Sequence, residues 1–381
     1  MFLKLGLTSF GGPVAHLGYF RDEFVVRRRW LDEPAYADLV ALCQFLPGPA
    51  SSQVGLAIGL SRAGYLGALA AWTAFTLPSA IALVLFAYGV EALGGLANSA
   101  WLHGLKIAAV AVVALAVLGM MRGLAPDRPR ATLAVASAVI ALAVPTAAGQ
   151  VAAIAPGGVA GLFFLHSAQA SAAPASLPLT VSRWEGAAAL AAFFLLLLGL
   201  PLLATQSGSL PLQLFDSFYR SGSLVFGGGH VVLPLLQAEV VPRGWVSNDA
   251  FLAGYGAAQA VPGPLFTFAA YLGAVIGGWG TAALCLIAVF LPSFLLVVGA
   301  LPYWETIRRK ALAQAALKGV NAAVVGLLLA ALYHPVWTAG ITDAKDFALA
   351  SMAFLLLFMW QAPPWLVVIL SAVGAGALAM L

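Results

Sequence analysis

The sequence predicts an all-α polytopic membrane protein built from two homologous halves. Of its 381 residues, 62% are hydrophobic and only 8% are charged, and the mean hydropathy is +0.98. Soluble domains carry about 25% charged residues, so this composition indicates an integral membrane protein. The apolar runs are far longer than β-strands, which favours transmembrane helices over a barrel. The net charge of +4 is small and gives no sign of a nucleic-acid-binding face.

A Pro-Gly-Pro motif that occurs twice shows how the chain is organised. Gln44–Pro49 (QFLPGP) returns as Gln259–Pro264 (QAVPGP), a shift of 215 residues. Phe10–Gly12 returns as Phe226–Gly228, a shift of 216 residues. Because several motifs recur at nearly the same spacing, we interpret the chain as a duplication. Each half then contains the same Pro/Gly-rich interruption within apolar surroundings.

The repeat divides the chain into three parts. We assign residues 1–165 to the first repeat and residues 209–381 to the second. Residues 166–208 contain a linker rich in Ala, Ser and Pro, followed by a transmembrane helix that has no counterpart in the repeat. The first helix is one or two turns shorter than its second-half equivalent. We therefore expect either a natural start upstream of Met1 or a trimmed sequence.

Helix signals accompany the first interruption. The first helix, residues 2–20, is interrupted at Phe10–Pro13, where two glycines and a proline weaken the hydrogen-bond ladder. Asp32 is a suitable N-cap for a helix over residues 33–45. Ser247 takes the same place in the second half.

The first Pro-Gly-Pro motif, Pro47–Pro49, separates two short segments, residues 33–45 and 50–60. Each is too short to span a bilayer. The pair forms either a re-entrant hairpin or a helix broken at mid-membrane. Such backbone is tolerated at membrane depth only where protein or a water-filled cavity surrounds it.

The other apolar segments supply the spanning helices. We expect Pro145 and Pro156 to break two shorter stretches, 131–148 and 149–165. The remaining predicted segments are 64–88, 101–121, 184–204, 211–225, 246–260, 265–276, 278–300, 314–333, 347–361 and 364–381.

Loop charges favour an inverted repeat. First-half arginines follow the first helix, at 27–29, and flank the 122–130 loop. In the second half, the basic cluster 308–310 lies in a loop whose first-half counterpart, 89–100, contains no Lys or Arg. Basic loops mark the cytoplasmic side of a membrane protein. Equivalent loops of the two halves would therefore lie on opposite sides of the membrane, as in an inverted repeat. The number of predicted membrane spans between the halves instead gives both halves the same orientation, unless one of the stretches between 131 and 165 does not cross the membrane.

The segments that follow each Pro-Gly-Pro motif are candidate anion sites. The first turn of a helix offers unpaired N–H groups and the positive end of the helix dipole. Ser51 and Ser52 add hydroxyl donors in the first copy, and Thr267 adds one in the second. Gln44 and Gln259 recur three residues upstream of the motif. The alternative is a proline-kinked packing element without a ligand.

The Phe-Gly-Gly segments are a second candidate, because glycine lets the backbone approach a ligand closely. His16 and His230 follow at unequal distances, so hydrogen-bonded interior histidines are an alternative to proton coupling. The predicted substrate site comprises Lys4, Ser9, Gly11, Gly12, Gln44, Pro47, Gly48, Pro49, Ser51, Ser52, Arg220, Gly227, Gly228, Gln259, Gly263 and Thr267.

Charged residues within the repeat are also candidates. Lys4 and Arg220 each lie six residues before a Phe-Gly-Gly motif, and cations in apolar helices mark a pathway or a partner. Pointing inward, they would balance a dianion; the alternative is that they snorkel to the headgroups. Glu23 and Glu239 recur and either pair with arginines or act in gating or proton coupling.

Lys106 has Asn321 as its equivalent in the second half, and both are candidates for lining a cavity. Cys43 and Cys285 lie at unmatched apolar positions and form no disulfide or metal framework. Neither a phosphate-binding loop nor a nucleophile elbow is present in the sequence, so enzymatic or ATP-driven chemistry has no support.

Taken together, the motifs resemble those of the chromate ion transporter family in its long-chain, two-domain form. The matching passages are LKLGLTSFGGPVAHLGYFRDEFV from Leu3, RRRWLD from Arg27 and QFLPGP from Gln44, with FGGGH and QAVPGP in the second half. The resemblance implies functional roles for Lys4, Phe10–Pro13, His16, Gln44 and Pro47–Pro49. The family usually has Asn or another polar residue directly after Pro-Gly-Pro, where this chain has Ala50.

The second copy departs further from the family pattern, because Leu265 and Phe266 follow its Pro-Gly-Pro motif. We therefore expect asymmetric binding that the first half dominates. The resemblance implies a secondary carrier of the bacterial inner membrane that exports chromate by alternating access, driven by the proton gradient. Sulfate is the expected competitor, since it too is a tetrahedral dianion.

The alternatives to this function are a carrier for sulfate or another oxyanion and a passive anion channel. The expected partners are the dianion, protons and the lipid bilayer, without nucleic acid, cofactor or metal. A homodimer is one possible assembly. Transport direction and stoichiometry stay open.

Overall fold

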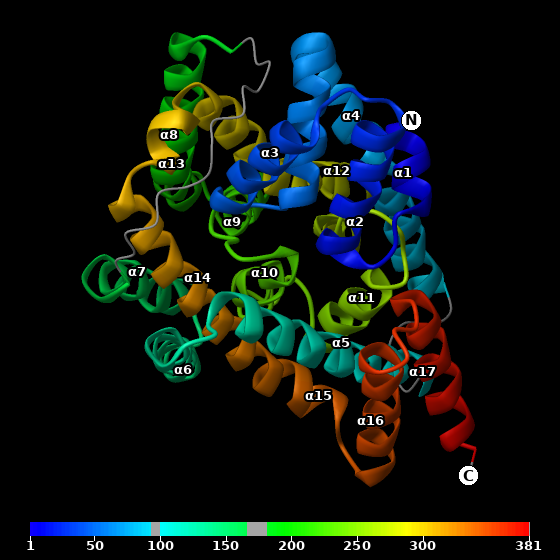
Figure 1. Cartoon of the computed structure of the whole chain (residues 1–381). Coiled ribbons are helices and arrows are strands. Elements are labelled where there is room, and N and C mark those ends of the chain that lie inside the picture. Colours follow the sequence, from blue (N-terminus) through cyan, green and yellow to red (C-terminus); the bar gives the residue numbers. More distant parts are fainter. Residues whose placement is uncertain (93–99, 166–180, 381) are drawn as a thin grey trace.

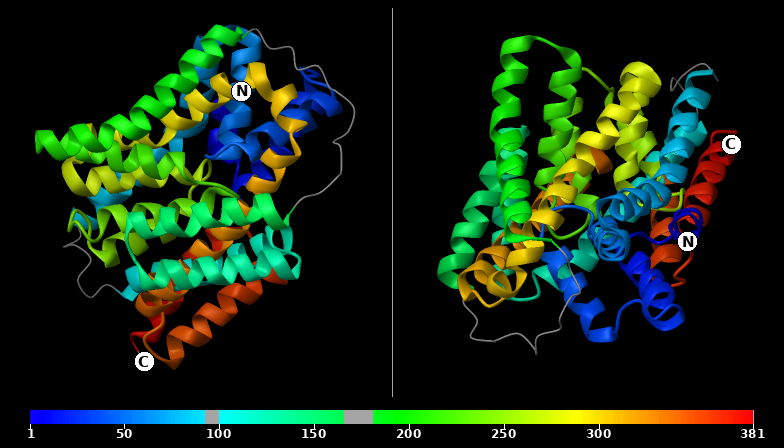
Figure 2. Two further views of the ribbon diagram at one scale, coloured as in Figure 1. Left: turned by 90° about the vertical axis from the view of Figure 1, so that its left-hand side faces the viewer. Right: turned by 90° about the horizontal axis from the view of Figure 1, so that it is seen from above.

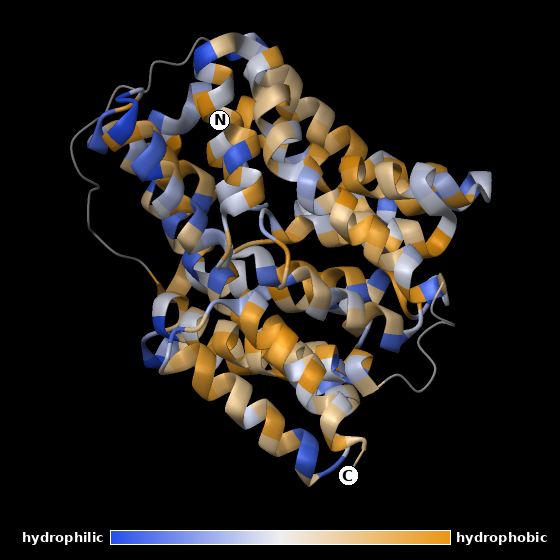
Figure 3. Ribbon diagram, turned by 90° about the vertical axis from the view of Figure 1, so that its right-hand side faces the viewer, coloured by the Kyte–Doolittle hydropathy of each residue, from blue (hydrophilic) through white to orange (hydrophobic). Residues whose placement is uncertain are grey.

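The computed structural model describes residues 1–92, 100–165 and 181–380. These residues form helices joined by short loops and contain no β-strand (Figure 1). Six of the helices are long and apolar enough to cross a membrane. Hydrophobic residues dominate the long helices, and hydrophilic residues gather mainly toward helix ends (Figure 3). The predicted all-α multi-pass membrane protein is thus confirmed.

The helices follow the order that the repeat predicts. The first half contains α1 (Phe2–Thr8), α2 (Gly12–Arg21), a π-helical turn (Asp22–Arg27), α3 (Glu33–Phe45), α4 (Ala50–Ala92), α5 (Ala100–Leu124), α6 (Arg128–Ala143) and α7 (Ala147–Phe164). The unpaired helix is α8 (Arg183–Ser207). The second half contains α9 (Leu210–Ser223), α10 (Val232–Val240), α11 (Asn248–Ala258), α12 (Phe268–Ala300), α13 (Trp304–Arg308), α14 (Ala311–Ala331), α15 (Thr338–Gly340), α16 (Ala344–Phe358) and α17 (Pro364–Leu378).

Local signals set several of these boundaries. Asp32 accepts a hydrogen bond from the N–H of Ala35 and caps α3, and Ser247 caps α11 in the same way. The break between α1 and α2 falls at the first Phe-Gly-Gly motif. The residues of the predicted linker at 166–180 lie outside the described part of the chain.

One expected break is absent. Pro156 lies inside α7, which continues through it, so our prediction of a break at this proline is wrong. The stretch is interrupted instead around Pro145, after which the Thr146 side chain caps α7. Helices in apolar surroundings tolerate proline where neighbouring helices support them, and α7 packs closely on α14 next to this point.

The long helices α4 and α12 each fold back at a glycine. In α4 the helical conformation is interrupted at Ala63 and Gly64. A Cβ added to Gly59 would lie 2.4 Å from the carbonyl oxygen of Gly67. Residues eight apart in a straight helix lie about 12 Å apart, so the two segments pack against each other. The same reversal occurs in α12 at Gly277 and Gly278.

The second segments of α4 and α12 pack against each other and run antiparallel. Tyr88, near the end of α4, stacks on Trp279, with 6.0 Å between ring centroids. Trp72, earlier in α4, contacts Phe290, later in α12, at 5.6 Å. Equivalent segments of the two halves thus pair with each other in opposite directions.

The last two helices of each half pack on the other half. The hairpin of α6 and α7 lies against α14, and the hairpin of α16 and α17 lies against α5 (Figure 1). Figure 2 shows α6 and α7 running side by side. Small residues allow this close approach: Gly319 of α14 meets Gly157 of α7, and its equivalent Gly104 of α5 meets Ser371 of α17. The halves are therefore interlocked.

A buried ion pair also joins the halves. Arg308 of α13 donates to Asp38 of α3 at 2.7 Å, and their side chains are 7% and 10% exposed. The indole N–H of Trp304 donates to the same carboxylate at 3.0 Å. This pair fixes the N-terminal part of α3 against the second half.

The crosswise packing makes Gly319 intolerant of a side chain. A Cβ at this position would lie 2.0 Å from the carbonyl oxygen of Gly157, so Gly319→Ala would force α14 away from α7. We expect destabilisation of about 1–3 kcal/mol, measured as a lower thermal unfolding temperature of the purified protein. The control is Gly199→Ala in α8, where a Cβ meets no atom within 4 Å. Equal unfolding temperatures for the two variants would contradict the interlocked packing.

Neighbouring arginines test the buried ion pair. Arg308→Ala leaves the buried carboxylate of Asp38 without its charged partner, and such a loss costs about 3–5 kcal/mol. Arg309 bonds to Glu305, as Arg308 also does, but its side chain is 67% exposed. We expect Arg309→Ala to change the free energy of unfolding by less than about 1 kcal/mol. Denaturant titration of both variants measures the difference, and similar losses would contradict this assignment.

Candidate functional site

Each Pro-Gly-Pro motif is hydrogen-bonded to the residue before the Phe-Gly-Gly motif of the opposite half. The N–H of Gly48 donates to the carbonyl of Val225 at 2.7 Å, and the N–H of Gly263 donates to the carbonyl of Ser9 at 2.9 Å. Both glycines have positive φ, 124° and 96°, a conformation that L side chains rarely adopt. The recurrence of both motifs therefore reflects a pair of equivalent junctions between the halves.

A cavity of about 150 Å³ lies at the second of these junctions. Water occupies about 30 Å³ per molecule in the liquid, so the cavity has room for a small hydrated ion. Its walls come from both halves of the chain. They are formed by Ser9, Gly11, Gly12, Pro13, His16, Val112, Leu115, Ala116, His230, Ala258, Gln259, Val261, Gly263, Leu265, Leu357 and Pro364.

Two polar atoms at the cavity have no hydrogen-bond partner among the described residues. They are Oγ of Ser9, whose residue is 1% exposed, and Nε2 of Gln259, which lies near the hydroxyl of Tyr255 without forming a well-aligned hydrogen bond to it. Buried polar groups are normally hydrogen-bonded, so these atoms are available to a polar ligand. A hydroxyl and an amide nitrogen both donate hydrogen bonds to an anion.

Two helices begin at the cavity wall. α2 starts at Gly12 and α17 starts at Pro364, and both residues line the cavity. The N-terminus of a helix presents unpaired N–H groups and a partial positive charge, which favour an anion. None of the described residues that line the cavity is Lys, Arg, Asp or Glu. The site therefore offers an anion neutral donors and helix ends.

The two histidines lie on this cavity in different environments. Nε2 of His16 is 3.1 Å from the carbonyl oxygen of Ser9, and Nδ1 is 3.3 Å from Oγ of Ser51. Nδ1 of His230 is 2.8 Å from the hydroxyl of Tyr255. The first Pro-Gly-Pro segment thus reaches the cavity wall indirectly, through the contact between Ser51 and His16.

The two predicted countercharges lie apart from the cavity lining. Lys4 is exposed on α1. Arg220 is held in a buried cluster by Asp216 at 2.6 Å and Glu239 at 3.4 Å. Glu239 also bonds to Arg243 at 3.1 Å. Two carboxylates and two guanidinium groups balance in charge, so Arg220 is already compensated by protein groups.

Several other predicted residues make local contacts. Glu23 bonds to Arg27 and Arg28 near the surface, and Lys106 pairs with Asp249 at 3.0 Å. The hydroxyl of Thr267 donates to the carbonyl of Pro264. Gln44 is exposed, whereas its second-half equivalent, Gln259, lines the cavity.

The remaining predicted residues lie near the first junction, formed by the first Pro-Gly-Pro motif and the second Phe-Gly-Gly motif. The carbonyl of Pro47 accepts a hydrogen bond from the side chain of Gln53, and Pro49 immediately precedes α4. Ser52 is buried with an unpartnered hydroxyl. Gly227 lies near Asn321 of α14, whose side-chain oxygen would be 3.7 Å from an added Cβ. Gly228 follows with a φ of 147°.

Sequence reasoning missed half of the wall, including Ala258, Val261 and Leu265 beside the predicted Gln259 and Gly263. Val112, Leu115 and Ala116 of α5, Leu357 of α16 and Pro364 of α17 all line the cavity. In the sequence, these residues lie within or beside predicted apolar segments and mostly carry no signal that separates them from their neighbours. Pro364 at the start of a predicted segment was the one available signal, since proline favours the first position of a helix.

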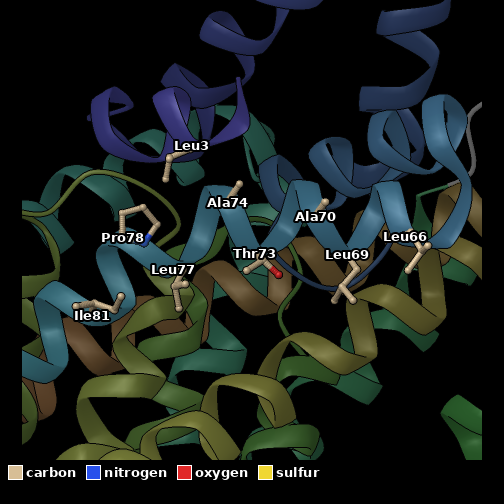
Figure 4. A pocket seen from close by; sticks show the side chains of 9 residues that line it. All are labelled: Leu3, Leu66, Leu69, Ala70, Thr73, Ala74, Leu77, Pro78 and Ile81. Carbon is tan, nitrogen blue, oxygen red and sulfur yellow. The ribbon is translucent and has the colours of Figure 1, made fainter.

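A larger groove lies between α1 and α4 (Figure 4). Its volume is about 560 Å³, and Leu3, Leu69, Leu77 and Ile81 are among its lining residues. These leucines and the isoleucine are between 40% and 52% exposed. Thr73 supplies the only polar side chain among the described residues of the lining. The groove suits a lipid chain or an apolar helix, and it lacks the donors that an anion needs.

The chain is similar to several known proteins. The family model described as "Chromate transporter" matches residues 1–162 and 212–377. The chromate transport protein of Pseudomonas aeruginosa is 30% identical over 98% of this chain and 89% of its own length. A probable chromate transport protein of Synechococcus elongatus is 27% identical over 87% and 82%. The chromate transport protein of Cupriavidus metallidurans is 25% identical over 100% and 92%.

No solved structure matches this chain. The family model covers both halves and leaves out the region between them, in agreement with the repeat and with the position of α8. The relatives cover the chain almost from end to end. The chain belongs to the chromate transporter family.

Proposed function

We propose that this protein carries chromate across the membrane through the cavity between its halves. The observation that carries the proposal is the set of unpartnered donors and helix N-termini around a cavity between the halves. The names of the relatives indicate chromate as the cargo. A tetrahedral dianion presents oxygen acceptors in every direction, which suits donors converging from both halves.

Uncharged hydrogen-bond donors also suit a carrier, because the anion must be released from the site as well as bound there. A fixed Arg or Lys in a medium of low dielectric constant would hold a dianion tightly. Hydrogen bonds from Ser9 and Gln259 and the dipoles of α2 and α17 each contribute about 1 kcal/mol. Their sum is modest, so binding through them is reversible.

We further propose that the halves form an inverted repeat and that transport follows alternating access. Equivalent helices α4 and α12 pack antiparallel, as a two-fold axis in the membrane plane requires. Inverted-repeat carriers bind their cargo near the midplane at discontinuous helices. The Pro-Gly-Pro and Phe-Gly-Gly breaks are the discontinuities of this chain. Export from the bacterial inner membrane, driven by the proton gradient, is part of this proposal.

Two alternatives keep the same site but change the function. Sulfate presents the same tetrahedral dianionic surface as chromate, so the donors around the cavity do not distinguish the two. A passive anion channel also uses broken helices. The cavity draws its walls from both halves, including α2, α5, α11 and α17, and a site shared by two halves suits a carrier in which the halves move relative to each other.

The matched glutamines Gln259 and Gln44 test the site. Nε2 of Gln259 is a donor at the cavity, and loss of one neutral hydrogen bond costs about 0.5–1.5 kcal/mol. We expect Gln259→Ala to weaken chromate binding to the purified protein by about two- to tenfold. Gln44→Ala changes an exposed residue and is expected to leave the affinity unchanged. Isothermal titration calorimetry measures both, and equal affinities would place the anion elsewhere.

Reconstituted vesicles test the mode of transport. We expect chromate flux to saturate with concentration, to respond to an imposed pH gradient and to be inhibited by sulfate, because one enclosed site must reorient in each cycle. Flux of radiolabelled chromate is the measurement. Flux that rises linearly with concentration and ignores the pH gradient would instead indicate a channel.

A further inference from the structure

His16 connects the two Pro-Gly-Pro junctions. The carbonyl oxygen of Ser9 receives the N–H of Gly263 from the second half at 2.9 Å. The same oxygen lies 3.1 Å from Nε2 of His16. On the other side of the imidazole ring, Nδ1 of His16 lies 3.3 Å from Oγ of Ser51, which belongs to the first turn of α4. A single row of contacts therefore runs from one Pro-Gly-Pro segment to the other.

Hydrogen-bond chemistry assigns the tautomer of His16. A carbonyl oxygen only accepts, so Nε2 must carry the hydrogen that points at Ser9. In the neutral ring Nδ1 is then an acceptor, and the hydroxyl of Ser51 donates to it. A proton taken up at Nδ1 reverses only this last bond, because the hydroxyl of Ser51 rotates and becomes the acceptor. His16 therefore gains a proton without losing any hydrogen bond.

The position of His16 couples such a proton to an anion. The residue is 1% exposed and lines the cavity whose other described walls carry no Lys or Arg. An imidazolium here would be the cation nearest to a bound anion. The attraction works in both directions, since a proton that strengthens anion binding is itself bound more tightly when the anion is present.

We propose that His16 takes up a proton at Nδ1 when an oxyanion dianion enters the cavity. The inference rests on the proposed function and adds to it the group that carries the proton. Proton and anion then occupy the protein together and cross in the same direction with a net charge of −1, so the electrical part of the proton gradient, negative inside, would drive the export.

Few other groups near His16 are able to take up the proton in its place. His230 shares the cavity, and Tyr255 bonds to it. From α3, the hydroxyl of Tyr36 donates to the carbonyl of Leu17, next to His16. From α4, Phe75 packs edge-on against the imidazole at 5.5 Å. His230 is therefore the matched control for His16.

Sulfate binding as a function of pH tests the proposal. Sulfate is the probe because it stays a dianion between about pH 5 and 8, the range in which histidine titrates, whereas chromate itself takes up a proton there. We expect the affinity of the wild-type protein to rise as pH falls, by at most about tenfold per pH unit for one linked proton. His16→Gln keeps an amide donor for Ser9 and should bind sulfate with little pH dependence. His230→Gln should retain the wild-type slope.

Proton uptake provides a second measurement that needs no variant. Titration calorimetry of the wild-type protein in two buffers of different ionisation enthalpy counts the protons bound with each sulfate. We expect a value approaching one toward the acidic end of the range. A value of zero throughout, or a full pH slope in folded His16→Gln, would overturn the role of His16 and leave the anion site standing. Absence of any oxyanion binding by the wild-type protein would overturn both.

Discussion

The structure depends on how backbone amides are satisfied at its two Pro-Gly-Pro breaks. A peptide N–H without a partner is costly in an apolar interior, and a turn between helix ends has no partner of its own. Gly48 and Gly263 find carbonyls only in the opposite half, at Val225 and Ser9. The breaks are therefore stable only where the halves meet, and this requirement brings both pairs of interrupted helices to the centre of the molecule.

The cavity follows from the same requirement. Helices that stop inside the protein leave their first N–H groups unused, and the starts of α2 and α17 face one space. The apolar side chains of α5 close that space without adding charge. The result is a buried site with donors but no fixed countercharge, while Arg220 is neutralised by Asp216 and Glu239 in a separate cluster.

The sequence predicted features that are local or repeated. The caps at Asp32 and Ser247, the break at Phe-Gly-Gly and the division into halves all have short-range signals, and the structure contains them. The pairing of one half's glycine motif with the other half's proline motif has no such signal, because it arises from long-range packing. For the same reason the wall residues of α5 could not be told from other apolar residues. Asp216, one helical turn before Arg220, was a usable hint of its neutralisation.

The exchange of terminal hairpins between the halves has an evolutionary consequence. Helices α14 and α5 each complete their packing with a hairpin from the other repeat, so a chain containing one repeat would leave these surfaces bare. A single-repeat chain of this kind would need a second copy to cover them, and a duplication would join the two copies in one chain. In the fused chain, each function has to be kept at only one of the two junctions. His16 can then differ from its counterpart Val232 in residue type, and Gln259 can line the cavity while its counterpart Gln44 does not.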